Sequence, residues 1–124
     1  MSHSLRSIAT EEEYRKYKET KAVDSPCVLC SQEPIQTFKY WKITKNDFPY
    51  DLIAETHHMI SPIRHAKELE LTEEEKSELL EIKAKSLNFY DAILESTPRM
   101  KTVPAHHHLH IFVTKDIASN LCLS

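Results

Sequence analysis

The sequence contains no glycine in 124 residues, whereas an ordinary protein carries roughly 7%. Glycine-rich phosphate-binding loops are therefore excluded, both the G-x-G-x-x-G loop of dinucleotide-binding proteins and the P-loop. Turns must depend on the six prolines and on Asn, Asp and Ser. A phosphate-bearing ligand would have to be held by other local groups.

The chain also lacks long apolar runs and an excess of positive charge. No run approaches the roughly 18 apolar residues of a membrane-spanning helix, and the first residues, MSHSLRSIATEEE, have no signal-peptide core. The net charge is −3, so no basic face predicts binding to nucleic acid or to an anionic membrane. We expect a cytoplasmic protein with neither of these partners.

Cysteine is scarce: Cys27, Cys30 and Cys122 are too few for a disulfide framework. In a reducing compartment the C-x-x-C pair is typical of a metal or redox site. A thioredoxin-like redox role needs a βαβ context, which the following residues do not predict. Two thiolates at this spacing can bind one zinc ion, and a closed tetrahedral site needs two further ligands. The candidates for these ligands are His57, His58, His65 and the histidines from 106 to 110.

The pattern of elements predicts one α+β domain over residues 1–124. Thr10 and Glu13 have capping-box spacing, which predicts a short helix in an N-terminal arm, 1–24. Aromatic and β-branched residues predict a strand from Ile35 to Lys45. A second strand is predicted from Leu52 to Pro62, and the two strands suggest an antiparallel pair.

The longest predicted helix runs from Thr72 to Thr97, with Thr72 and Glu75 as a capping box and Pro98 after its end. Its apolar stripe contains Leu80, Ala84, Leu87 and Leu94, with Ile82, Phe89 and Ile93 beside it. A last strand is predicted from His106 to Thr114. The expected fold is an antiparallel sheet with one long helix packed on it, a core over 27–113 and a tail over 114–124.

Histidines alternate at the start of that last strand. His106, His108 and His110 would share one face, and His107 would lie on the other face with Leu109. Three rings at steps of roughly 6–7 Å can present one ring as a nucleophile with neighbours that orient it, or can chelate a metal. A solvated, histidine-rich face is the alternative, and three histidines in register disfavour it.

Four motifs, in order, resemble those of the histidine triad superfamily. HHMISPIRH, from His57 to His65, resembles its H-φ-φ-φ-x-P-x-x-H segment, and HHHLHIF, from His106, resembles its H-φ-H-φ-H-φ-φ strand. CVLC resembles the C-x-x-C of zinc-binding members. NDFPYD resembles the segment before the central histidine in the galactose-1-phosphate uridylyltransferase and dinucleotide phosphorylase branches. The resemblance covers Cys27 to Val113, and a long helix separates the middle and last motifs, as in the family.

The resemblance implies a nucleotidyl hydrolase or transferase that acts at the α-phosphate of a nucleotide or nucleotide conjugate. His108 would be the nucleophile and would form a covalent nucleotidyl-histidine, because an imidazole with a pKa of about 6.5 is largely neutral near pH 7. His110 would contact the phosphate and assist the leaving group, and His106 would have an orienting role. The resemblance also implies homodimers and a structural zinc ion. The zinc ligands would be Cys27, Cys30, His65 and His106.

The chain departs from the family just before the triad, where a glycine-containing loop is usual. Here the segment is STPRMKTVPA, so Thr102, Lys101 or Ser96 would have to supply the phosphate contacts. Asn46 and Asp51 flank a turn and are candidates for holding a ribose.

Two other residues are singled out by their types. Trp41 is a candidate for stacking on a base, although aromatic strand residues are more often part of a core. His107 occupies a normally apolar slot, where it would need a polar partner if it faces the core.

Two rival functions stay open at this stage. A degenerate member of the superfamily would hold a nucleotide or a protein partner without turnover, and the missing glycine loop favours that alternative. A cupin-like enzyme would use His106, His108 and His110 to bind a redox metal. Cupins are glycine-dependent β-barrels, so the absence of glycine and the long helix argue against this class.

Overall fold

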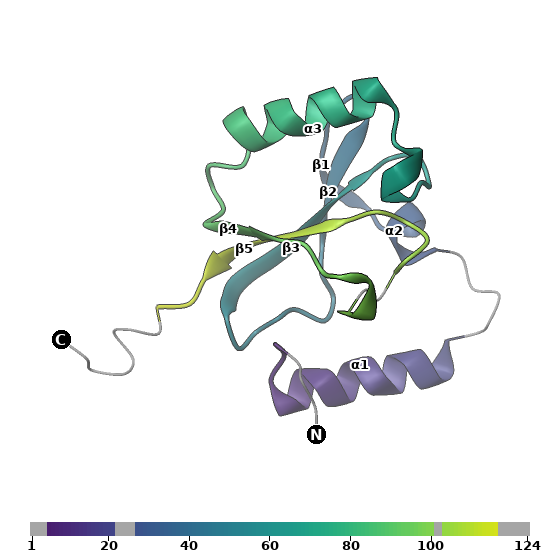
Figure 1. The fold of residues 1–124 in the computed structure, drawn as a ribbon. Helices are drawn as coiled ribbons and strands as arrows, with labels where there is room; N and C mark the ends of the chain where they lie inside the picture. The colour runs from purple at the N-terminus through teal and green to yellow at the C-terminus, as the bar shows by residue number, and fades with distance from the viewer. Residues whose placement is uncertain (1–4, 22–26, 101–102, 117–124) are drawn as a thin grey trace.

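The computed structural model describes residues 5–21, 27–100 and 103–116. Within these residues, five strands form one antiparallel sheet in the order β1-β2-β3-β5-β4 (Figure 1). The strands are β1 (Pro34–Thr37), β2 (Trp41–Lys45), β3 (Ala54–Pro62), β4 (Ala92–Leu94) and β5 (Leu109–Thr114). The helices are α1 (Ile8–Thr20), α2 (Val28–Ser31), α3 (Glu73–Lys85) and the 3₁₀ turns η1 (Glu68–Glu70) and η2 (Pro98–Met100). The predicted α+β class is confirmed.

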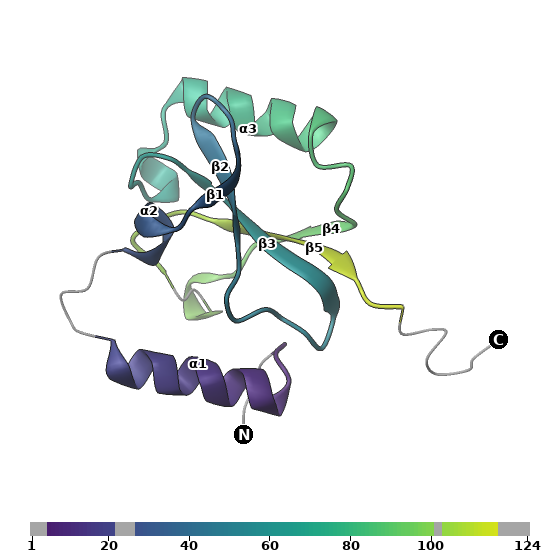
Figure 2. The ribbon, with the colours of Figure 1, turned by 180° about the vertical axis from the view of Figure 1, so that it is seen from behind.

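The sheet lies between two helices, and each of its faces has its own chemistry. Figures 1 and 2 show α3 on one side of the sheet and α1 on the other. Ile60 of β3 lies opposite Leu109 of β5, and the next pair along is Met59 opposite His110. Because successive side chains alternate between faces, Ile60 and Leu109 point to the α3 side and His110 points to the α1 side.

The hydrophobic core occupies the α3 side. Trp41 is fully buried there, and its indole N–H donates to the carbonyl of Glu75 at 2.8 Å, which fixes α3 on the sheet. A buried apolar cluster surrounds this contact. Its members are Trp41, Ile43, Ile60, Ala66, Leu71, Ile82, Leu87, Leu109 and Ile111. The face toward α1 carries His57 and His110 beside Phe112 and Met59.

The predicted continuous strand from Ile35 to Lys45 is wrong, because β1 and β2 are two strands of a hairpin. The turn between them contains none of the usual turn residues, which is why the sequence pattern missed it. The carboxylate of Glu78 on α3 accepts hydrogen bonds from the backbone N–H groups of Lys39 (3.2 Å) and Tyr40 (2.7 Å). A tertiary contact therefore stabilises this turn. The predicted antiparallel pairing holds for β2 and β3.

The start of the long helix was predicted correctly and its end was not. Thr72 and Glu75 form the expected capping box at the start of α3. The helix ends at Lys85, not at Thr97. The predicted stripe is right only in part, because Leu87 is buried in the core whereas Leu80 is 68% exposed. Within α3 the buried residues are Glu75 and Ile82, of which Ile82 lies beside the predicted stripe.

The residues after α3 form a sheet edge because their backbone finds partners on β5. The N–H of Asp91 donates to the carbonyl of Phe112 at 2.9 Å, and the Asp91 carboxylate accepts from the N–H of Thr114 at 2.8 Å. These bonds start β4 beside β5. The periodicity of the sequence does not show that the residues after Lys85 will hydrogen-bond to β5 and not continue the helix.

The last strand is shorter than predicted. It begins at Leu109 and not at His106, since the preceding backbone bonds outside the ladder. The N–H of His107 donates to the carbonyl of Ala66 at 2.7 Å, for example. The residues from His106 to His108 therefore lie outside the β3–β5 ladder.

Helix α1 has no buried residue, and it is attached by polar contacts at its start and by the rings of Tyr14 and Tyr17, which each lie 5.1 Å from that of Phe48. Ser7 caps its N-terminus, so the predicted capping box of Thr10 and Glu13 is wrong. The Asp51 carboxylate accepts from the N–H (2.6 Å) and hydroxyl (2.9 Å) of Ser7 and from the hydroxyl of Thr10 (2.5 Å). Burial would raise the pKa of Asp51, but these hydrogen bonds outweigh it and lower the pKa. No helix among the described residues is long and apolar enough to cross a membrane.

We predict that Asp51→Ala destabilises the protein by about 1–2 kcal/mol, because three hydrogen bonds at the start of α1 are lost. Urea unfolding would measure the loss, and far-UV circular dichroism would report loss of helix. Asp47→Ala is the matched control, since Asp47 is exposed in the neighbouring turn. Equal effects of the two substitutions would contradict the anchoring role of Asp51.

Candidate metal centre and histidine site

Cys27, Cys30, His65 and His106 come together beside the sheet, with their ligand atoms all within 4.8 Å of one another. The Sγ atom of Cys30 lies 3.2 Å from Nδ1 of His65 and 3.4 Å from Nδ1 of His106. The Sγ atom of Cys27 lies 3.5 Å from Nδ1 of His106. A tetrahedral ion with sulfur and imidazole ligands has S–N edges of about 3.5 Å. The cluster could therefore hold a metal ion.

Local structure explains why these four residues meet. The N–H of Cys30 donates to the carbonyl of Cys27 at 3.1 Å, and this turn at the start of α2 places both sulfurs on one side. His65 follows the end of β3, and His106 precedes β5, which pairs with β3. Burial raises the pKa of Cys30, and the neighbouring Cys27 adds to this effect. A bound cation would oppose that effect, since metals bind the thiolate.

The orientation of the His106 ring is set by a hydrogen bond from its other nitrogen. Nε2 of His106 lies 2.8 Å from the carbonyl oxygen of Pro62. Because a carbonyl only accepts, Nε2 carries the proton and the lone pair of Nδ1 faces the sulfurs. Burial lowers the pKa of His106, whereas the Pro62 bond raises it in part. Metal-binding histidines in proteins are usually held by such a second bond.

His108 is oriented by the backbone of His106. Nδ1 of His108 lies 3.0 Å from the carbonyl oxygen of His106, and the His108 side chain is buried. The carbonyl must accept, so the proton of the neutral ring resides on Nδ1 and the lone pair on Nε2. Nε2 is then the nucleophilic atom of this imidazole.

The tautomers of His57 and His110 follow from one backbone donor. The N–H of Tyr50 donates to Nδ1 of His57 at 2.9 Å, so the proton of neutral His57 must be on Nε2. That Nε2 lies 2.8 Å from Nδ1 of His110, which therefore accepts and leaves the His110 proton on Nε2. The side-chain nitrogen of Asn46 is more distant from His57 Nε2, at 3.4 Å, and does not compete. A directed chain thus ends in an N–H donor on His110.

Both histidines of this chain are neutral at pH 7. Burial lowers the pKa of His57 to about 4, and the nearby Arg6 guanidinium adds to the effect. Burial likewise lowers the pKa of His110 to about 3, with further contributions from His108, His57 and Arg6. His57 and His110, with His108 beside them, form what we call the histidine row. The rings of His57 and His110 can donate and accept hydrogen bonds in fixed directions without carrying positive charge.

The structure brings some of the predicted substrate-binding residues to this face and not others. Asn46 lies beside His57, as described above. Asp51 is engaged by the start of α1, and Trp41 is fully buried on the α3 side, so we assign both to the architecture. Thr102 and Lys101 lie outside the described residues, as does the third cysteine, Cys122.

His107 faces the core, as its place in the alternation predicted. It is 4% exposed and packs edge-on against Trp41, with ring centroids 6.2 Å apart. His107 therefore acts as an aromatic packing residue on the face opposite the histidine row.

Sequence reasoning missed the central place of His57 and Tyr50. The ring of Tyr50 packs against both His57 (centroids 4.5 Å apart) and His110 (4.9 Å). The signal for His57 was available, because it begins the HHMISPIRH motif and alternation places it on the same face as Met59. The role of Tyr50 rests on a backbone N–H, which no residue type reveals.

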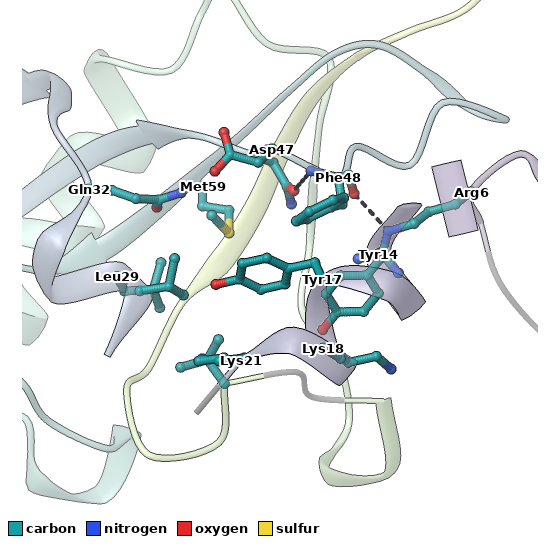
Figure 3. A pocket seen from close by; sticks show the side chains of 13 residues that line it. Arg6, Tyr14, Tyr17, Lys18, Lys21, Leu29, Gln32, Asp47, Phe48 and Met59 are labelled. Carbon is teal, nitrogen blue, oxygen red and sulfur yellow. Dashed lines mark hydrogen bonds between the residues drawn. The ribbon is translucent and has the colours of Figure 1, made fainter. Parts of the chain in front are cut away.

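A cavity of about 250 Å³ lies next to the row, between α1, α2 and the turn after β2 (Figure 3). The rings of Tyr14 and Tyr17 each lie 5.1 Å from that of Phe48, and together they form its aromatic wall. Asn46, beside His57, and Met59, opposite His110, connect the cavity to the row. The remaining lining residues are Arg6, Lys18, Lys21, Val28, Leu29, Gln32, Asp47 and Val103.

No protein-family model matches the sequence, and no curated protein is significantly similar to it. Membership of the histidine triad superfamily therefore stays a prediction from the four motifs.

The low pKa values of His57 and His110 predict that acid weakens the fold. Their folded pKa values of about 4 and about 3 lie below the ordinary 6.5, so the unfolded chain takes up protons first as the pH falls. Stability is fully present above pH 6.5 and is lost as the pH falls toward these values. At pH 5 the protonation of each ring in the unfolded chain should lower the free energy of unfolding by about 2 kcal/mol relative to pH 7.5.

Urea unfolding at pH 7.5 and pH 5 tests this expectation against His57→Asn, whose side-chain oxygen can still accept from the Tyr50 N–H. The variant should lose part of the pH dependence, and the difference between the two proteins cancels the protons taken up by other groups. Equal pH dependence in both proteins would contradict the conclusion that the low pKa of His57 contributes to the loss of stability in acid.

Proposed function

We propose that the protein is a nucleotide-binding phosphohydrolase or nucleotidyltransferase of the histidine triad type. It would act at an α-phosphate through a covalent nucleotidyl-His108 and carry a structural zinc ion. The observation that supports this most directly is the bond between Nδ1 of His108 and the carbonyl of His106, 3.0 Å long. It directs the Nε2 lone pair of a neutral imidazole, which is the state that a nitrogen nucleophile needs.

In the proposed reaction, Nε2 of His108 attacks the α-phosphorus and forms a P–N bond. The bond from phosphorus to the leaving group breaks, and the leaving group departs with its electron pair. Water, or the hydroxyl of an acceptor in a transferase, then attacks the same phosphorus and releases its proton to solvent. The P–N bond breaks, and its electron pair returns to Nε2 of His108. His110 would donate its Nε2–H to a phosphate oxygen near the leaving group throughout these steps, held in that role by His57.

The cavity beside the row has the properties of a nucleoside site. Its aromatic wall offers stacking surfaces for a base. The volume of about 250 Å³ is of the order that a nucleoside needs. Arg6, Lys18 and Lys21 outnumber the single carboxylate of Asp47 among its lining residues, which favours an anionic ligand.

Zinc suits the cluster of Cys27, Cys30, His65 and His106 better than other ions, because two thiolates and two imidazoles are the ligands of closed structural zinc sites. When bound, zinc would supply a fixed junction between α2, the end of β3 and the start of β5. Iron or manganese in a histidine row, as in a cupin-like enzyme, is disfavoured, since His57 and His110 bond each other.

A nucleotide-binding module without turnover is the second candidate function. The burial of the row favours it, since His108 is only 4% exposed and His110 only 2%. A substrate would need the row to open for the α-phosphate to reach Nε2 of His108.

The proposed chemistry predicts an intact-mass increase of one nucleotidyl group after brief incubation with an adenosine phosphoramidate. The adduct should vanish in His108→Ala, which lacks the nucleophile. It should form at least tenfold more slowly in His110→Ala, since loss of one directed hydrogen-bond donor typically costs roughly 10²–10³ in rate.

His58→Asn is the matched control, because His58 is next to His57 in sequence and bonds Tyr90 instead of the row. Adduct formation there should match the unmodified protein. Binding of nucleotides with no adduct and no released AMP would favour the binding module, and an adduct that persists in His108→Ala would assign the nucleophile to another residue.

The metal assignment predicts one zinc ion per chain in the purified protein, measured by elemental analysis. His65→Asn should lower zinc affinity by at least tenfold and lower the melting temperature, because it removes one of four ligands. His58→Asn again serves as the control and should retain zinc. Full zinc retention in His65→Asn would place the ion elsewhere.

A further inference from the structure

We propose that Cys27 and Cys30 form a peroxide-sensitive thiol pair whose oxidation releases the metal and loosens the catalytic histidine, His108. The inference rests on the structural zinc and the role of His108 in the proposed function. It concerns control of that site and not the reaction itself.

The metal cluster is open to solvent at Cys30 and His65 and closed at His106. Cys30 and His65 are exposed and Cys27 is half-buried, whereas His106 is completely buried. Both cysteines are free thiols, on either side of one turn of chain. Their sulfurs lie within 4.8 Å of each other and need only side-chain rotation to approach the disulfide distance of about 2 Å. A small oxidant can therefore reach both sulfurs while the sheet stays intact.

The oxidant named here is hydrogen peroxide. One thiolate attacks the peroxide, the O–O bond breaks, and a sulfenic acid and hydroxide form. The second thiolate attacks that sulfur, the S–S bond forms, and a second hydroxide leaves. The two sulfurs together lose two electrons, the two peroxide oxygens gain them, and two protons from solvent convert both hydroxides to water. The zinc ion leaves because only His65 and His106 remain as ligands.

The effect would reach His108 through a single residue. The ring of His106 faces the sulfurs on one nitrogen and Pro62 on the other, and its backbone carbonyl holds Nδ1 of His108. Loss of the metal removes one of the two contacts that fix the His106 ring. The residue that sets the tautomer of His108 is then held less firmly. His57 is held independently, by Tyr50 and His110.

The test uses the full chain with Cys122→Ser, so that Cys27 and Cys30 are the only cysteines. The zinc-loaded protein is treated with one equivalent of hydrogen peroxide. Intact mass should show the loss of two hydrogens, and a chromogenic chelator should detect one released zinc per chain. Dithiothreitol with added zinc should reverse both changes. Cys30→Ser in the same background cannot close the disulfide and should not show this mass change.

The effect on His108 is measured by long-range ¹H–¹⁵N spectra of the imidazole rings, which report each tautomer without any substrate. Zinc-loaded protein should show a single Nδ1–H form of His108, and oxidation should shift or broaden its signals while those of His57 stay unchanged. Removal of zinc by a chelator, with the thiols reduced, should produce the same change. This arm does not depend on the folding of Cys30→Ser.

Three results would overturn the inference: thiols that stay reduced with zinc bound in excess peroxide, a disulfide that forms with zinc retained, or zinc release that leaves the His108 signals unchanged. These outcomes are distinct from failure of the proposed function. A protein that forms no nucleotidyl adduct can still show peroxide-driven zinc release, whereas a reduced protein that binds no zinc refutes the metal assignment on which the inference rests.

Discussion

Three bonds of one residue, His106, join the two parts of this site. Its Nδ1 atom lies among the cysteine sulfurs, its Nε2 atom donates to Pro62 and its carbonyl accepts from His108. The residue is completely buried, so each polar atom must have a partner, and satisfying all three fixes the entry to β5. The metal cluster and the histidine row are therefore connected through His106, and a displacement of one part would shift the other.

The antiparallel pairing of β3 and β5 separates the histidine row from the core. Because the side chains alternate, one register places Ile60 and Leu109 under α3 and places Met59 and His110 on the opposite face. A slip of one residue would bury His110 in the apolar core and expose Leu109 on the other face. Packing of the apolar side chains under α3 thus fixes the strand register, and the register positions His110 on the opposite face.

Features that depend on residue type and on the spacing of residues could be predicted from the sequence. Features that depend on a contact with a residue far along the chain could not. The cysteine pair and the alternation of the histidines were readable because cysteine, histidine and a period of two carry the information locally. The choice of His65 and His106 among the candidate ligands came from the family resemblance. The β1–β2 turn was missed because Glu78, about forty residues away, stabilises it. The end of α3 was misplaced because β5 offers the backbone of Asp91 a better partner than another helical turn does. The tautomer chain was invisible since it begins at the backbone N–H of Tyr50.

Burial and neutrality of the row are two aspects of one constraint. A buried charged imidazole is costly, and burial accordingly lowers the pKa of His57 to about 4 and of His110 to about 3. Neutral rings can be packed edge to face, as His108 and His110 are with centroids 5.1 Å apart, without repulsion. Arg6 brings a positive charge next to these neutral rings: its guanidinium lies over the ring of Tyr50 at 5.0 Å and contributes to lowering the pKa of both His57 and His110. Residues of the N-terminal arm thereby become part of the electrostatics of the site.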